Sequence, residues 1–161
     1  MKPKFNADER GCQQTTMSKL MLALITFLGG AAATIQPSIN ARLARHIGVI
    51  ESSSISFLVG TLALVAAAYT VSPGDYRGLQ DAQWWQLTGG FLGAFFVAVT
   101  TFAVPRIGTT ATMALIISAQ LIFGMVLDHF GMFGLRGAAI DLRRIIGAAV
   151  LGLGVYLILK R

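Results

Sequence analysis

Five long apolar runs, separated by short polar stretches, dominate the order of residues along this chain. Their lengths approach or reach the ~20 residues that a helix needs to cross a hydrocarbon core of about 30 Å. None alternates apolar with polar residues as the strands of a membrane barrel do. We therefore predict an all-α membrane protein with five transmembrane helices, at approximately residues 19–40, 52–71, 84–104, 109–130 and 143–159. The last is the shortest, so it needs a locally thinner bilayer or snorkelling flanks.

Residues that end helices stand between the predicted spans. Ser-Pro-Gly at 72–74 follows the second span, residues 105–108 separate the third from the fourth, and Gly131 follows the fourth. Trp84 and Trp85 open the third span, where amphipathic rings favour the level of the lipid headgroups. These signals agree with a division into five helices.

The composition excludes an ordinary water-soluble domain. Hydrophobic residues make up 55% of the 161 residues and charged residues 12%, whereas a soluble domain has roughly 25% charged residues. The net charge of +6 does not indicate nucleic acid, because the basic residues stand between the apolar runs and mark helix ends. A single cysteine, Cys12, and two widely separated histidines argue against an internal disulfide or a metal centre. We expect no cofactor.

Residues 1–16 are polar and lack a helical apolar stripe, so we expect a disordered leader before a transmembrane domain of residues 17–161. Met17 is an alternative start to Met1. The stretch that follows Met17 also fits a secretory signal peptide, with a basic start, an apolar run and an Ala-x-Ala ending. Because four more apolar runs follow, we expect the first run to stay in place as a helix.

The charge distribution gives little orientation. An odd number of spans puts the termini on opposite sides of the membrane, and from Met17 onward each side carries five basic residues. Only the leader favours a cytoplasmic N-terminus, and it does so weakly. A chain without orientation bias can insert both ways and pair antiparallel with itself. The basic residues are Lys19, Arg77, Arg136, Arg143 and Arg144 on one side, and Arg42, Arg45, Arg106, Lys160 and Arg161 on the other.

A polar stripe interrupts the first apolar run. Gly29, Ala33, Gln36 and Asn40 follow one another at intervals of four, three and four, so they share one helix face. Pro37 has no N–H, which kinks the helix and leaves the carbonyl of Ala33 without its helical partner. Unsatisfied polar groups in a bilayer must face protein or water. We interpret the stripe as part of a substrate path; alternatively, the amides bond a neighbouring helix or the span has ended by Gln36.

The fourth run carries a similar stripe, with Gln120, Gly124 and Asp128 four residues apart. A lone mid-span amide facing lipid is unfavourable, so Gln120 should point inward. Asp128 lies near a helix C-terminus, where the dipole disfavours a carboxylate. It either carries a coupling proton or forms a structural ion pair, and the available partners are His129, Arg136, Arg143 and Arg144.

Small residues four apart predict close helix packing. The pairs are Gly89 and Gly93, Gly90 and Ala94, Ala63 and Ala67, and Ala148 and Gly152. The first span contains no acidic residue, unlike that of the small multidrug-resistance exporters. The spans also contain no serine–histidine–acid set, zinc-protease motif or phosphate loop, so we do not expect an enzyme.

Several of these segments together resemble one family. The runs are QPSINARL at 36–43, SFLVGT at 56–61, Gln120 followed by DHFGMFG at 128–134, and RRIIG at 143–147. This combination is similar to the YdcZ-like family of inner-membrane exporters, within the drug/metabolite transporter (DMT) superfamily. The resemblance implies a multi-pass protein of the bacterial inner membrane, built as a five-helix unit. It places Gln36, Asn40, Gln120 and Asp128 at polar positions that recur in the family.

The resemblance therefore leads us to expect one half of a DMT-type transporter. Alternating access normally needs two repeats that move around a shared site. The unit would then work either as a homodimer, for which an antiparallel arrangement is one option, or with a paired homologous subunit. Its substrate would be a small polar or amphipathic metabolite. The alternatives are a non-transporting membrane assembly subunit and a channel.

Overall fold

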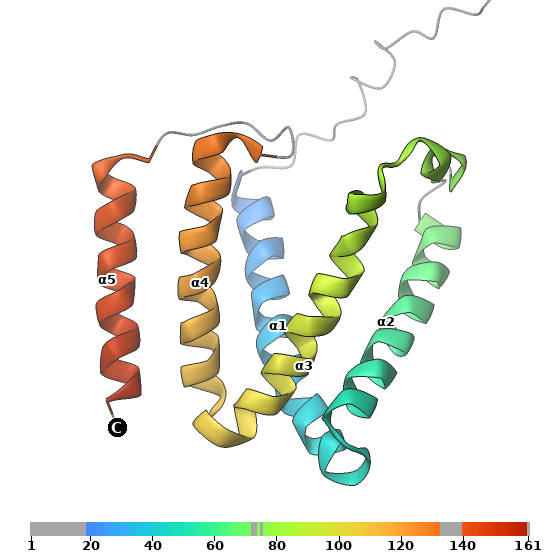
Figure 1. The fold of residues 1–161 in the computed structure, drawn as a ribbon, viewed down its shortest axis with the longest axis horizontal. Helices are drawn as coiled ribbons and strands as arrows, with labels where there is room; N and C mark the ends of the chain where they lie inside the picture. The colour runs from blue at the N-terminus through green and yellow to red at the C-terminus, as the bar shows by residue number, and fades with distance from the viewer. Residues whose placement is uncertain (1–18, 72–73, 75, 133–139, 161) are drawn as a thin grey trace, which may run out of the picture. The chain divides into compact units, whose positions relative to one another are not determined.

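The computed structural model describes residues 19–71, 74, 76–132 and 140–160, and within these ranges all regular structure is helical. Five helices are long and apolar enough to cross a membrane, as the sequence predicts. They are α1 (Lys19–Ile47), α2 (Val49–Val71), α3 (Gly89–Ile107), α4 (Thr109–Phe130) and α5 (Leu142–Leu159), with two short 3₁₀ segments, η2 (Tyr76–Asp81) and η3 (Trp84–Thr88), between α2 and α3 (Figure 1). The predicted leader, residues 1–16, lies outside the described residues.

Two helices extend further than the sequence predicted. The first predicted span stops at residue 40, whereas α1 passes through Pro37 and ends at Ile47. The predicted break at residues 105–108 is too wide, because α3 includes Pro105 and ends at Ile107. A proline removes one backbone donor but has a φ compatible with a helix, and a membrane offers the chain no better conformation. The third candidate span begins at Trp84, as predicted; its first residues, Trp84–Thr88, form η3, and α3 continues it.

The helical contacts divide the chain into two units, residues 1–35 and residues 36–161. In the first unit the structure describes the helical residues 19–35. The second unit contains the C-terminal part of α1 and all of α2 to α5. In this second unit α2 packs against α3, α3 against α4, and α4 against α5 (Figure 1).

A single glycine makes each of two tight connections in the second unit. Gly48 joins α1 to α2 with a φ of 99°, and Gly108 joins α3 to α4 with a φ of 85°. These are left-handed conformations that residues with a Cβ rarely adopt. Each glycine also donates its N–H to the helix before it, to Ala44 O at 2.9 Å and to Val104 O at 3.0 Å respectively. Both turns lie at the end of the unit where α5 finishes, which we call the turn end (Figure 1).

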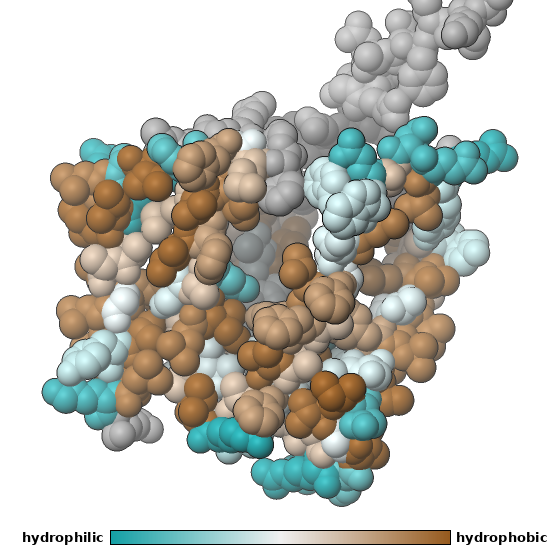
Figure 2. All heavy atoms as spheres, in the orientation of Figure 1, coloured by the Kyte–Doolittle hydropathy of each residue, from teal (hydrophilic) through white to brown (hydrophobic). Residues whose placement is uncertain are grey.

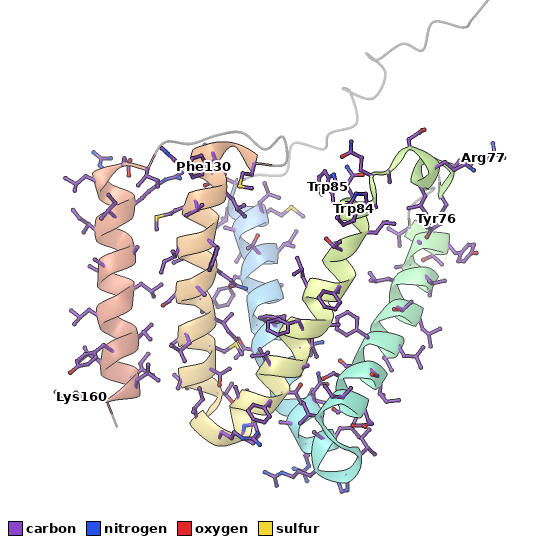
Figure 3. The ribbon with its side chains drawn as sticks, in the orientation of Figure 1. Tyr76, Arg77, Trp84, Trp85, Phe130 and Lys160 are labelled. Atoms are coloured by element: carbon purple, nitrogen blue, oxygen red, sulfur yellow. The ribbon has the colours of Figure 1, made fainter. Side chains whose placement is uncertain are left out.

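The opposite end, which we call the loop end, is built differently. Here α2 leads into η2 and η3, and α4 is joined to α5 by a longer stretch. Tyr76, Arg77, Trp84, Trp85 and Phe130 lie at this end, whereas Lys160 lies at the turn end (Figure 3). Aromatic rings at one level of a helical bundle are typical of a membrane–water interface.

The core of the second unit is concentrated toward the turn end. The buried residues are Pro37, Asn40 and Ala41 on α1, Ser52 and Ser53 on α2, Val97, Thr100, Thr101 and Val104 on α3, Ala111 and Thr112 on α4, and Val155 on α5. Elsewhere large apolar side chains are open: Leu64 is 73% exposed and Phe91 is 76% exposed. On the face that Figure 2 shows, hydrophobic residues cover most of the middle and hydrophilic residues gather mainly toward the two ends. Lipid or another protein chain must cover such faces.

Three of the four glycines in the predicted small-residue pairs have open space beside them in the described chain. A Cβ placed on Gly89, Gly90 or Gly152 would meet no described atom within 4 Å. Gly93 is different, because its Cβ would lie 3.2 Å from Cζ of Phe57 on α2. The close packing that the sequence predicts is therefore present between α3 and α2 at Gly93, while the other glycine faces are left open.

Candidate functional site

Six polar residues are buried near the turn end, and we call them the polar layer. Each is at most 6% exposed, and none carries a charge. They come from four helices: Asn40 on α1, Ser52 and Ser53 on α2, Thr100 and Thr101 on α3, and Thr112 on α4. Small hydroxyl residues allow helices to approach closely, and in lipid they also provide hydrogen bonds between helices.

One hydrogen bond of the layer links two helices across the first turn. Ser52 Oγ donates to the backbone oxygen of Asn40 at 2.7 Å, and Ser52 is fully buried. Three other hydroxyls of the layer donate to backbone carbonyls three or four residues earlier in the chain. These bonds are Ser53 Oγ to Val49 O at 2.8 Å, Thr100 Oγ1 to Val97 O at 3.0 Å, and Thr112 Oγ1 to Gly108 O at 2.8 Å.

Two polar atoms of the layer have no hydrogen-bond partner among the described residues: Asn40 Nδ2 and Thr101 Oγ1. Asn40 is 5% exposed and Thr101 is fully buried. Buried polar groups in native proteins are nearly always paired, so an unpaired one indicates a missing water, ion or ligand. Because Asn40 Nδ2 donates and the threonine hydroxyl can donate or accept, both can bind a polar solute.

Gln36 lies one helical turn before Asn40 and contacts α2. Its Nε2 donates to Ser56 Oγ at 3.2 Å, and both side chains are partly buried. On the same stretch of α1, the Ser38 hydroxyl lies 3.2 Å from the Thr109 hydroxyl of α4. The C-terminal part of α1 is thus joined by side-chain hydrogen bonds to both α2 and α4.

The structure brings together only some of the predicted path residues. Gln36 and Asn40 lie on one stretch of α1 in the second unit, beside Pro37 in the helix interior. Ala33 belongs to the first unit. Gln120 is exposed on α4, eight residues or about 12 Å along the helix from Thr112. Gln120 has no covering helix within the described part of the second unit, and its inward orientation stays a prediction.

Sequence reasoning missed the hydroxyl residues of the layer. A serine or threonine in an apolar helix can satisfy itself on its own backbone, so its presence alone does not indicate a site. A signal was present in the doubled residues Ser52-Ser53 and Thr100-Thr101, each close to a helix end. Adjacent hydroxyls point to different sides of a helix, so both would be buried only where several helices meet.

Asp128 forms an ion pair at the loop end. Its Oδ2 accepts a hydrogen bond from Nη1 of Arg144 at 3.2 Å, and the side chains are 45% and 38% exposed respectively. Asp141 caps α5, because its Oδ1 accepts from the backbone N–H of Arg144 at 2.8 Å. Arg144 is thus the partner found among the four that the sequence offered; Arg136 lies outside the described residues. His129 instead lies edge-on to Phe130, with ring centroids 5.1 Å apart.

A cavity of about 650 Å³ lies at the turn end, between the α3–α4 connection and the end of α5. Its lining residues are Ile107, Gly108, Thr109, Thr110, Ala111, Leu157, Ile158 and Leu159. Two threonines give this otherwise aliphatic wall a polar part. Arg106 and Lys160, the neighbours of the lining residues in sequence, are exposed, and Arg106 is held by its bond to Phe102 O at 2.5 Å. The described residues contain no group of side chains suited to hold a metal ion.

Comparisons with known proteins place the chain in a family. Residues 21–157 match the family model described as "Putative inner membrane exporter, YdcZ". The chain is 25% identical to the inner membrane protein YdcZ of Escherichia coli (strain K12) over 148 residues, which cover 90% of this chain and 99% of that protein. No solved structure matches the chain.

Proposed function

Because this chain belongs to the YdcZ family of inner-membrane exporters, of the DMT type, we propose that it exports a small polar or amphipathic metabolite as a dimer of five-helix units. It is a multi-pass protein of the inner membrane. Within one unit, Gln36 and Asn40 line the path. Gln120 and the carbonyl of Ala33 join them as predictions from the sequence.

The observation that carries this proposal is the unpaired amide of Asn40 inside the polar layer. An amide donor without a partner is costly in a membrane protein unless it serves a ligand or water. Gln36 lies one turn away on the same helix, and its own bond to Ser56 at 3.2 Å is long enough to exchange for a bond to a solute. Polar groups within membrane spans typically mark a substrate pathway.

The dimer is supported by the surfaces that one unit leaves open. The glycines of α4 and α5 have no neighbour for a Cβ within the described residues, and large apolar side chains along α2 are exposed. Closely approaching helices from a second unit would fill such glycine faces. A second unit would also cover Gln120. The balanced basic residues permit an antiparallel pair, since they give neither orientation a clear advantage.

The Gln36–Ser56 bond supports a second candidate, a membrane assembly subunit without transport. In that protein, the polar side chains would only hold helices and subunits together. A leucine at position 36 would then weaken assembly, and there would be no solute flux to lose. A channel would use a similar lining, but its flux would neither saturate nor show exchange between solutes.

The test uses the full chain in proteoliposomes, with Gln36→Leu and Gln120→Leu measured separately. We expect each variant to insert and assemble normally but to lose most of the solute efflux, assayed by mass spectrometry of a loaded metabolite mixture. Gln80→Leu is the matched control, because Gln80 lies in η2 outside the membrane-spanning helices and is exposed. Unchanged efflux in both variants contradicts the assignment. Loss of assembly without any wild-type efflux favours the second candidate.

A further inference from the structure

We propose that the polar layer selects uncharged solutes that carry hydroxyl or amide groups, and that the Asn40 amide and the Thr101 hydroxyl, both unpaired among the described residues, each supply a hydrogen bond for such solutes. This inference rests on the proposed transport function and specifies its substrate class. It also adds a residue, Thr101, that the sequence did not single out.

The chemistry of the layer favours neutral solutes. Its side chains are one amide and five hydroxyls, and no buried residue in the described part of the chain is charged. A charged solute that entered this layer would lose its hydration and would meet no counter-charge. Transporters of charged solutes usually place an ionisable residue in the path for this reason. A neutral solute loses less hydration and can recover it through hydrogen bonds to amides and hydroxyls.

The two unpaired atoms indicate which neutral solutes fit. Asn40 Nδ2 needs an acceptor, and Thr101 Oγ1 can take either a donor or an acceptor. A hydroxyl or an amide supplies both functions, whereas a hydrocarbon would leave both atoms unsatisfied. The hydroxyls of Ser53, Thr100 and Thr112 already donate to backbone oxygens, so they have less to offer a solute.

The charges around the turn end add a further preference. Exposed basic side chains flank the layer, and Glu51 is the acid on the described part of this end. These basic residues are Arg42, Arg45, Arg106 and Lys160. Their field repels cations before they reach the layer, whereas an anion reaches the entrance and stops because no positive group is buried inside. Uncharged solutes should therefore pass best, anions next and cations worst.

The charged groups at the loop end do not alter this expectation. Asp128 and Arg144 are paired with each other. Asp128 is 16 residues from Thr112 on α4, a distance of about 24 Å along the helix axis. At that separation neither group can serve as a counter-charge for a solute held in the polar layer.

The first experiment compares size-matched solutes that differ in charge. Proteoliposomes are loaded at pH 6 with two triplets in equal amounts: glucose, glucuronate and glucosamine, then lactamide, lactate and 1-amino-2-propanol. Efflux of each is measured by mass spectrometry against protein-free liposomes. We expect protein-dependent efflux of the neutral member of at least one triplet and about 100-fold slower efflux of its charged analogues. Efflux of a charged member at a similar rate overturns the inference while leaving transport intact. No efflux of any member overturns it as well and also counts against the proposed function.

The second experiment tests Thr101 itself with Thr101→Val, which keeps the shape and removes the hydroxyl. A hydroxyl that only stabilised the fold would make this variant less stable. Since Thr101 Oγ1 has no partner in the described structure, we expect thermal stability in detergent to be kept or raised. Efflux of the neutral solute should fall about fivefold, the loss of one hydrogen bond. The matched control is Thr70→Val on α2, whose exposed hydroxyl bonds Ala66 O. Unchanged efflux in Thr101→Val, or lower stability with no change in the preference for neutral solutes, overturns the role of Thr101.

Discussion

The two ends of the second unit differ in how their helices are connected and held together. At the turn end, single glycines connect the helices, small residues allow close approach, and buried amides and hydroxyls fill the interface. At the loop end, longer segments connect the helices, side chains are exposed, and opposite charges meet in an ion pair. Lipid tails are as apolar as leucine, so burying leucine does not hold helices together in a membrane. At the turn end buried polar contacts and close backbones have that role, whereas at the loop end the polar contact between helices is a partly exposed ion pair.

The largest loss of stability is expected at the turn end, from Gly108→Ala. Gly108 has a φ of 85° and a ψ of 155°, a region that is essentially restricted to glycine, although its missing side chain has open space. The alanine variant should therefore lose about 1–3 kcal/mol of unfolding free energy through backbone strain alone. Unfolding in mixed detergent micelles, followed by circular dichroism, measures this loss.

The control for that strain is Gly124→Ala in α4. Gly124 also has no atom within 4 Å of a Cβ, but its backbone is helical. Alanine is the better helix former by about 1 kcal/mol, so this variant should be unchanged or slightly more stable in a single unit. Equal losses in the two variants would contradict the assignment of the Gly108 effect to its left-handed backbone conformation.

A smaller effect is expected from Ser52→Ala within the polar layer. The change removes the 2.7 Å bond from Ser52 Oγ to the backbone oxygen of Asn40, which links α2 to α1. We expect a loss of about 1 kcal/mol, measured by the same unfolding titration. Ser54→Ala is the matched control, because its exposed hydroxyl bonds Ile50 O in its own helix, and it should change stability by less than about 0.5 kcal/mol. If the two variants are equally stable, the interhelical bond adds nothing to the turn end.

The smallest effect is expected at the loop end, from Asp128→Asn and Arg144→Gln. The pair is roughly 40% exposed, so solvent screening should hold its coupling free energy below about 1 kcal/mol. A double-mutant cycle at low and high salt measures this coupling, which should shrink as salt rises. We also expect Asp128→Asn to keep solute efflux. Loss of efflux with unchanged stability would assign Asp128 to proton coupling instead of a structural ion pair.

The sequence predicts the five spans well, because an apolar run of about 20 residues is rarely found outside a membrane-spanning helix. It predicts two helix ends poorly: α1 continues from Asn40 to Ile47, and α3 includes Pro105. Helix-breaking residues lose much of their effect where no water competes for the backbone. The sequence offers four candidates for the ion-pair partner of Asp128. Identifying Arg144 among them requires the packing of α5 against α4. The sequence did not predict that the Thr101 hydroxyl is buried and unpaired within the described part of the chain, because most threonines in a helix can bond their own backbone and the residue type does not show which of them do.

Gln120 marks a different limit. Its mid-span amide was predicted to face inward, and in one chain it is exposed. A single sequence shows which groups need a partner but not whether that partner belongs to the same molecule. The same is true of the open glycine faces.

The brevity of the connections at Gly48 and Gly108 has a practical consequence for mapping the protein in its native membrane. One side of the bilayer exposes almost no backbone between helices for a protease to cut, while residues 72–88 and 131–141 join helices on the other side. Digestion of sealed vesicles would therefore cleave a uniformly inserted population from one surface alone. If the molecules are inserted in both orientations, digestion from either surface would release the same fragments from part of the chains. The ratio of the fragment yields from the two surfaces would then give the proportion of chains in each orientation.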